Sequence, residues 1–355
     1  MDIDETENNL SSTEIYDLIG KENGLIAWSK MKVSNNYDKK IYIYSQIEKF
    51  VKHISFNKNP AFTKIDNNRF YSGNRDQPLH ALIGLFNFYV SGYSRYYIFS
   101  PHVGIFFDCC KDMKILHDIG ENDFSAEWLD DELNKIEKYN ALIVSIAKKL
   151  ESSEFKSTLN KRMQNSKKNS ASLCLYEQQL FDSYETLMIL RVDFTYHDSQ
   201  AQYVTLERAK KDLKRFKDNM RNKKRLSLHQ AGYIWRLEYR EVKGYYFHMI
   251  FVFDGEKVSD DVKLAEEIGE YWCKYVNAES TLTISHQSVL IDRNFINYNE
   301  IYRNRTGCGM PILQRDDSEL RRVFRKNALG YIAMADRFLM IKGEKGRSFD
   351  KGRII

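Results

Sequence analysis

The spacing of apolar residues changes along the chain from a helical to a strand-like pattern. In residues 133–150 the apolar positions recur every three or four residues, which is typical of an amphipathic helix. The segment TLMILRVDFTY, residues 186–196, instead alternates apolar and polar positions, and its polar side carries Arg191 and Asp193. The pattern therefore predicts a mainly helical first half followed by a region that contains a sheet.

The segments after residue 196 alternate between the two patterns. Helical spacing returns in 206–220 and 261–276, whereas aromatic and β-branched runs occupy 232–239, 245–253 and 281–290. The first two of these runs are joined by a short segment that ends in glycine, so they predict a hairpin. The resulting order, β-α-β-β-α-β, predicts an α+β domain of the ferredoxin-like arrangement, with a mainly antiparallel sheet and helices on one face.

Polar segments mark the expected domain boundaries. Residues 151–172 are rich in Lys, Ser and Asn and poor in large apolar residues, which is typical of a linker. They separate a mainly helical domain at 14–150 from the sheet-containing domain at 173–345, whose last helix is predicted at about 318–340. The ends of the chain are expected to be tails: 1–13 disordered and 346–355 basic.

Composition narrows the class of protein. The 355 residues carry 54 Lys and Arg against 49 Asp and Glu, a net charge of +5 that is too small to indicate a polyanionic partner by itself. The five cysteines lack both the density of a disulfide framework and the repeated Cys-x-x-Cys of a zinc site. No unbroken apolar run reaches the roughly 18 residues of a membrane span. We therefore expect a cytoplasmic protein with reduced thiols and no membrane partner.

Positive charge is concentrated on one predicted helix. Between Glu207 and Arg225 there are ten basic and three acidic residues. Most of the basic residues fall opposite the apolar positions of this helix, which predicts a DNA-binding face, although a solvated amphipathic face has the same pattern. The candidate DNA-binding residues are Lys210, Lys211, Lys214, Arg215 and Lys217, with Arg325 and Lys326 on the last predicted helix.

The predicted hairpin carries one carboxylate and one imidazole. Glu238 and His248 share a face if the turn or a bulge makes the sum of paired residue numbers even, whereas a regular four-residue loop pairs Glu238 with Phe247. Asp193 joins them if its strand lies beside His248. Such an oxygen-rich site suits Mg²⁺ or Mn²⁺ bound to a phosphate. The alternative is a hydrogen-bonded sheet histidine, with Glu238 paired to Arg236.

Other motifs give no support to other cofactors. His102, Cys109, Cys110 and His117 offer imidazoles and thiols, but adjacent cysteines in an aromatic run lack familiar zinc spacing, so buried thiols are favoured. Neither G-x-x-x-x-G-K-[ST] nor G-x-G-x-x-G occurs in the chain, so ATP-driven and dinucleotide chemistry have no support from the sequence.

The second half of the chain resembles the inovirus gene-two-type replication proteins, also called the YagK/YfjJ family. The resemblance covers roughly residues 175–345 and rests on five segments in order: LRVDFTY, WRLEYREVKGYYFHMIFVFDG, LAEEIGEYW, TGCGMPILQRDD and LGYIAMADRFLMIK. That family is similar to the HUH-type rolling-circle replication initiators, whose fold is the β-α-β-β-α-β arrangement. The resemblance therefore implies an HUH-type domain after the helical half.

The resemblance also implies an activity: metal-dependent nicking of single-stranded origin DNA, which leaves a 5′-phosphotyrosine and a free 3′-hydroxyl. It implies Tyr331 as the nucleophile, His248 as a metal ligand and Glu238 as the acidic metal partner, with Asp193 nearby. The cofactor would be Mg²⁺ or Mn²⁺, acting as a Lewis acid on the phosphate and helping to deprotonate the phenol. The implied partners are single-stranded or origin DNA and host replication proteins.

Two positions depart from the pattern of the family. Tyr246 stands at the first metal-binding histidine, and Met334 stands three residues after the tyrosine, where the family favours lysine. Arg337, Lys326 or a basic side chain of the 207–225 helix could replace that cation. Two hypotheses follow: a phage- or prophage-type replication initiator that nicks DNA, or a catalytically impaired DNA-binding regulator or interaction protein on the same fold. A partner-binding protein whose active part is the N-terminal half is a third.

Overall fold

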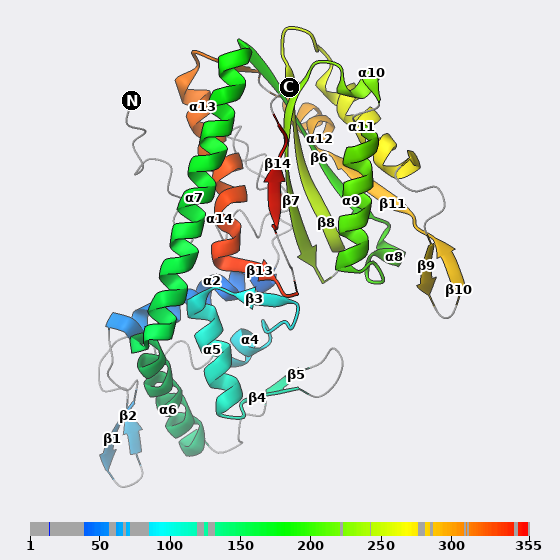
Figure 1. Cartoon of the computed structure of the whole chain (residues 1–355). Helices are drawn as coiled ribbons and strands as arrows, with labels where there is room; N and C mark the ends of the chain where they lie inside the picture. Colours follow the sequence, from blue (N-terminus) through cyan, green and yellow to red (C-terminus); the bar gives the residue numbers. More distant parts are fainter. Residues whose placement is uncertain are drawn as a thin grey trace.

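A six-stranded sheet with long central strands forms the centre of the second half of the protein (Figure 1). The computed structural model describes Glu14 and residues 39–56, 62–66, 69–71, 85–118, 124–126, 132–220, 223–241, 243–275, 281–284, 287–308, 310, 312–343 and 347–353. Within them the protein is of mixed α and β structure, with antiparallel strand pairing, which confirms the α+β prediction. None of the described helices is long and apolar enough to cross a membrane.

The sheet follows the order β11-β6-β8-β7-β14. Its long strands are β6 (Thr186–Tyr196), β7 (Gln230–Arg240) and β8 (Gly244–Asp254), and its shorter ones are β11 (Arg293–Asn297), β14 (Phe349–Lys351) and β12 (Leu313–Gln314), which pairs with the start of β6. The runs predicted as the first strand and the hairpin are thus strands, because their aromatic and β-branched side chains fill both faces of the sheet. All of β6 after Thr186 is buried, including the side predicted to be polar.

Helices cover both faces of this sheet. On one face lie α9 (Leu206–Met220) and α11 (Asp261–Tyr275), which match the two predicted helices and share a core with Phe194, Trp235 and Phe247. The other face packs against α7 (Ser153–Ser183), α12 (Tyr298–Thr306) and α14 (Gly330–Phe338). Figure 1 shows α9 on one side of the sheet and the long α7 and α14 on the other. The two helices predicted for the β-α-β-β-α-β unit therefore lie on one face, as expected, and the other face is covered by helices that the prediction did not include.

The described part of the N-terminal half is mainly helical, as predicted. Its main helices are α2 (Lys39–Phe56), α4 (Phe86–Val90), α5 (Pro101–Asp112) and α6 (Glu132–Glu151). Its short strands are β1 (Thr63–Asp66), β2 (Arg69–Tyr71), β3 (Tyr97–Phe99), β4 (Leu116–Asp118) and β5 (Phe124–Ala126). Cys109 and Cys110 are buried in α5, as expected. One apolar core runs from these helices to α14 and the adjacent face of the sheet, and β3 pairs with β13 (Leu339–Ile341), so the two halves pack together.

Three segments of the chain differ from the structure expected for them. Residues 151–172, predicted as a linker, belong to the end of α6 and to α7, because a polar segment without Gly or Pro can continue as a helix when part of it packs on neighbours. The fourth strand of the core sheet is β11, whereas residues 281–290 form a separate hairpin of β9 (Thr281–Ile284) and β10 (Gln287–Leu290). The tail expected at 346–355 contains β14, which pairs with β7, while residues 1–13 lie outside the described part.

Two glycines test how closely the helices pack. A Cβ added at Gly269 on α11 would lie 2.1 Å from the Phe295 ring on β11, so we predict that Gly269→Ala lowers the free energy of unfolding by about 1–3 kcal/mol. The matched control is Gly104→Ala on α5, where no described residue lies within 4 Å of the added Cβ, so we expect an increase of about 0.5–1 kcal/mol. Chemical denaturation measures both changes, and a Gly269→Ala protein as stable as wild type would contradict this packing.

Candidate active site

The register of the sheet brings the predicted site residues onto one face. Asp193 on β6 lies directly opposite His248 on β8, and Glu238 on β7 lies opposite Tyr246. The pairing of the hairpin begins at Arg240 and Gly244, so the sums of paired residue numbers are even. Glu238 and His248 therefore share a face, as the first of the two predicted registers requires. This face is the one that packs against α14.

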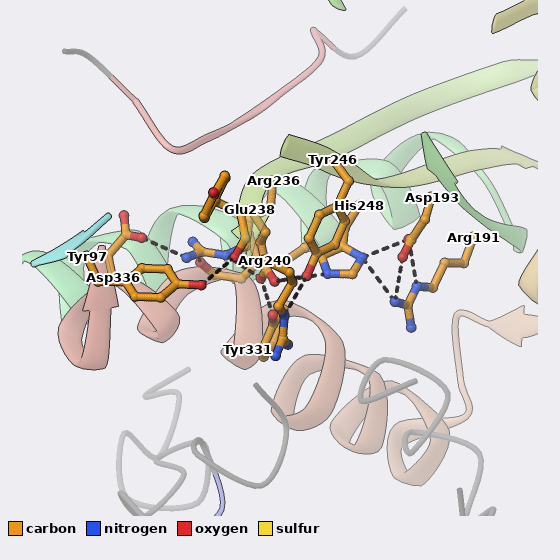
Figure 2. A network of polar contacts seen from close by, with 12 residues as sticks. Tyr97, Arg191, Asp193, Arg236, Glu238, Arg240, Tyr246, His248, Tyr331 and Asp336 are labelled. Atoms are coloured by element: carbon orange, nitrogen blue, oxygen red, sulfur yellow. Dashed lines mark hydrogen bonds and ion pairs between the residues drawn. The ribbon is translucent and has the colours of Figure 1, made fainter. Parts of the chain in front are cut away.

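Tyr331 reaches the same place from α14. The helix predicted at 318–340 is divided into α13 (Ser318–Phe324), a π-helical turn η2 (Arg325–Leu329) and α14, which begins one residue before Tyr331. Such π-helical turns are frequent at functional sites. The Tyr331 hydroxyl donates a hydrogen bond to Oε1 of Glu238, and its ring centroid lies 6.0 Å from that of His248. Tyr331, Glu238, His248 and Asp193 are thus brought together, as Figure 2 shows.

Glu238 is the centre of this network. Besides the Tyr331 hydroxyl, its carboxylate accepts hydrogen bonds from the Tyr246 hydroxyl at 2.8 Å and from Nε of Arg236 at 3.1 Å. Nε2 of His248 lies 3.4 Å from its Oε2 atom. Burial alone would raise the pKa of Glu238, but the charges of His248 and Arg236 outweigh this effect and hold the pKa well below its usual value. The carboxylate is therefore ionised inside the protein.

His248 lies between two carboxylates. Its Nδ1 atom lies 2.7 Å from Oδ1 of Asp193, while its Nε2 atom faces Glu238. Burial lowers the pKa of His248, but the two carboxylates outweigh burial and raise the pKa above its usual value, which favours the imidazolium. Nδ1 also lies 3.0 Å from Nη2 of Arg191, so each ring nitrogen has a partner and neither is left as an unshared ligand for a metal ion.

Three arginines complete the network. Arg191 lies two residues before Asp193 on β6, 3.4 Å from its carboxylate, with its guanidinium 3.9 Å from the centroid of the Tyr298 ring. Arg236 on β7 donates to Asp336 at 2.7 Å and to the carbonyl of Ile332 at 3.2 Å, both on α14. Arg240, at the end of β7, donates from Nε to the Tyr246 hydroxyl at 3.1 Å.

The electrostatics of the phenol follow from this environment. Burial and the neighbouring Glu238 carboxylate raise the pKa of Tyr331 well above its usual value, and Arg236 and Arg240 act in the opposite direction. Tyr331 is only 3% exposed. In this closed arrangement Tyr331 is thus a neutral donor to Glu238, and reaction with a substrate requires the site to open.

The donor set does not fit a divalent cation as it is arranged here. No group of three or more His, Cys, Asp and Glu side chains in the described part of the chain is placed to hold a metal ion. More importantly, Asp193 and Glu238 are already neutralised by guanidinium and imidazolium groups, whereas Mg²⁺ and Mn²⁺ need oxygen ligands with uncompensated charge. Arg191, Arg236 and His248 thus compensate the carboxylates that the sequence predicts as metal ligands.

The predicted DNA-binding residues lie in two separate places. Lys211, Lys214 and Arg215 of α9 are exposed and Lys210 and Lys217 are half-buried, but the sheet separates this helix from Tyr331. In η2, Arg325 forms an ion pair with the buried Glu177 at 2.5 Å, and Lys326 lies 3.3 Å from Glu14. The guanidinium of Arg236 lies 5.9 Å from the centroid of the Tyr331 ring, and the expected replacements for the lysine at Met334 do not include Arg236.

Two hollows lie near the network. A cavity of about 30 Å³, little more than a water molecule needs, is lined by Arg236, Glu238, Arg240 and Asp336. A larger groove of about 460 Å³ lies between α7, α14 and β14 and includes Arg162, Arg337 and Arg347. Asp336 and Ser348 line both, and Ser348 donates to Asp336. The groove therefore comes within one residue layer of the candidate site.

Sequence reasoning missed the arginines as site residues. Each stands two positions from a predicted site residue on the same strand, Arg191 beside Asp193 and Arg236 and Arg240 beside Glu238, and this period of two is the signal that would have placed them on the same face. The alternative interpretation is also partly right, because Arg236 does pair with Glu238 and His248 is hydrogen-bonded within the sheet.

A comparison with protein families supports part of the resemblance. Residues 151–305 match the family described as the YagK/YfjJ C-terminal domain. The match includes the strands that carry Asp193, Glu238 and His248, and it ends before α14, so Tyr331 lies outside it. No curated protein and no solved structure matches the chain.

The charge balance of the network leads to a prediction about stability. Asp193→Asn keeps the shape of the side chain but leaves Arg191 and His248 as buried cations with one fewer carboxylate, so we expect the free energy of unfolding to fall by about 3–5 kcal/mol. The control is Glu270→Gln on α11, where the Glu270–Lys274 pair is half exposed, with a cost of about 0.5 kcal/mol or less. Denaturant titration compares the two variants, and equal losses would contradict a tightly coupled buried network.

Proposed function

We propose that this protein is a replication initiator of phage or prophage type, which nicks single-stranded DNA by attack of Tyr331 on a phosphodiester. The observation that carries the proposal is the convergence of Tyr331, Glu238, His248 and Asp193 from one helix and three strands into a single buried network. Its partners would be single-stranded or origin DNA and host replication proteins, encountered in the cytoplasm.

The topology of the sheet supports the finer assignment of the fold. Numbered along the chain, the core strands β6, β7, β8 and β11 lie in the order fourth, first, third, second, with β6 and β7 joined through α9 and β8 and β11 joined through α11. This is the order of a ferredoxin-like β-α-β-β-α-β unit, on which HUH-type initiators are built. The tyrosine helix α14 packs on the face opposite α9 and α11, beside the imidazole and carboxylates.

The contacts of Tyr331 suggest how the protons move. The phenolic proton passes to Glu238, which already accepts it in a hydrogen bond, as the bond from Oη to phosphorus forms and the bond from phosphorus to O3′ breaks. The departing O3′ takes the proton from Nε2 of the His248 imidazolium. The proton on Glu238 then returns to His248 across the 3.4 Å that separates them. The products are a 5′-phosphotyrosine and a 3′-hydroxyl.

Covalent capture tests this proposal. Full-length protein incubated with Mn²⁺ and a randomised single-stranded DNA library should form a protein–DNA adduct that survives denaturation. Tyr331→Phe, which removes only the nucleophilic oxygen, should abolish the adduct, whereas Tyr302→Phe on α12 should leave it unchanged. An adduct that persists undiminished in Tyr331→Phe would show that another group attacks.

One observation favours a second function. Tyr331 is 3% exposed and is a neutral hydrogen-bond donor, so a protein that never opens would bind DNA without cutting it. The exposed lysines of α9, on the far face of the sheet, provide a surface for such a regulator. This alternative is a DNA-binding module on the same fold, catalytically impaired by the positions of Tyr246 and Met334.

The two functions differ in what salt and α9 do. For the regulator, binding to single-stranded DNA weakens with salt, and each of Lys211→Gln and Lys214→Gln lowers the slope of log affinity against log salt by about 0.7. Lys148→Gln on α6 serves as the control and should leave the slope unchanged. Filter binding over a salt series measures the slopes, and the regulator is excluded if the same DNA is cut efficiently through Tyr331.

A further inference from the structure

The charges around Tyr331 suggest what replaces a metal ion at this site. Arg191, Arg236 and Arg240 balance the carboxylates of Asp193, Glu238 and Asp336 even before His248 is counted. An added divalent cation would therefore enter a buried cluster that has no negative charge left to hold it, and it would have to displace guanidinium groups. The His248 imidazolium then leaves the cluster with one uncompensated positive charge. An added phosphate diester, by contrast, would neutralise that charge.

The donors of these arginines point in the same direction. Arg191 is only 2% exposed, and its Nη1 atom is buried without a hydrogen-bond partner in the described part of the protein. A buried donor without a partner costs stability, and this one can donate to the oxygen of a ligand that enters the site. Guanidinium groups also present paired N–H donors that match phosphate oxygens, and they stay charged when buried.

Arg236 and Arg240 line the cavity beside Glu238, the carboxylate that accepts the Tyr331 hydroxyl, and the guanidinium of Arg236 lies 5.9 Å from the centroid of the Tyr331 ring. Both residues lie on β7: Arg236 also pairs with Asp336 on α14, and Arg240 lies at the end of the strand, where it is half-buried. Arg240 rests on the Tyr246 hydroxyl, the side chain that stands at the histidine position of the metal-binding pattern. Tyr246, which replaces the histidine, thus provides a hydrogen-bond acceptor for the guanidinium of Arg240.

We propose that the guanidinium groups of Arg236 and Arg240, rather than a divalent cation, bind and neutralise the phosphate that Tyr331 attacks. This inference rests on the proposed function for the identity of the nucleophile. The cations stabilise the charge on the non-bridging oxygens as the Oη–phosphorus bond forms, and the protons follow the route through Glu238 and His248. The groove between α7, α14 and β14 is a hollow through which a strand can approach, because it shares Asp336 and Ser348 with the cavity beside Glu238.

Orthovanadate, a phosphate analogue that accepts a fifth ligand, tests phosphate binding by Arg236 and Arg240 without the need for a DNA sequence. In buffer stripped of divalent ions it should raise the melting temperature of the full-length protein and bind measurably by calorimetry. Arg240→Met should weaken this binding about tenfold or more, since a hydrogen bond to a charged group is lost, and Arg240→Lys should restore it in part. The control is Arg315→Met, at a half-exposed ion pair with Glu185, which should bind vanadate like wild type.

The outcomes separate this inference from the proposed function. Three results would overturn metal-free phosphate binding by the arginines. They are vanadate binding that requires Mn²⁺, no vanadate binding with or without Mn²⁺, and vanadate binding that is unchanged in Arg240→Met. In parallel, the DNA adduct should form in EDTA as well as in Mn²⁺. If vanadate binds through Arg240 without metal but no DNA adduct forms under either condition, phosphate binding by the arginines is supported and nicking is refuted. An adduct that forms only with Mn²⁺ would do the reverse.

Discussion

The ionised carboxylate of Glu238 is the group on which the candidate site depends. Burying a carboxylate costs several kcal/mol unless charges and hydrogen bonds compensate for it. Here the compensation comes from Arg236 on the same strand, His248 on the neighbouring strand and the hydroxyls of Tyr246 and Tyr331. Because one partner lies on α14, the solvation of this single group ties the helix with the candidate nucleophile to the sheet.

The same constraint explains why the protein is closed around its site. Arg236 joins Asp336 and the carbonyl of Ile332 as well as Glu238, so one guanidinium holds α14 in its register on β7. The helical half adds contacts at the end of this strand, where Tyr97 donates to the carbonyl of Tyr239 at 2.9 Å and Lys40 pairs with Glu241 at 2.5 Å. An anion that competes for Arg236 would weaken its bonds to Asp336 and to the carbonyl of Ile332 on α14.

Local patterns were sufficient for most of the sheet and helices. The period of two in β6, the glycine-ended turn of the hairpin and the apolar spacing of α9 are encoded within each segment, so their positions followed from the sequence. The errors arose where tertiary packing decides. The polar residues of α7 have the composition of a linker, but this helix packs on α14. The fourth strand is β11 and not the 281–290 run, because β11 is the segment that pairs with β6.

The site shows the same division. Asp193, Glu238, His248 and Tyr331 could be named from their order and strand positions, and they do meet. Their ionic partners could not, because whether an arginine beside a carboxylate points to water or into the core depends on what covers that face. Here α14 and α12 cover it, and Arg191 and Arg236 become buried members of the network. In the proposal made above, these guanidinium groups take the role that the sequence predicts for a metal ion.

The most direct test of this account is to find the residue that carries DNA after reaction in the absence of divalent metal. Wild-type protein would be incubated with the single-stranded library in EDTA, digested with nuclease and protease, and analysed by mass spectrometry of the peptides. We expect a nucleotide attached through phosphate to Tyr331. Attachment at a different residue, or attachment at Tyr331 only when Mn²⁺ is supplied, would contradict it.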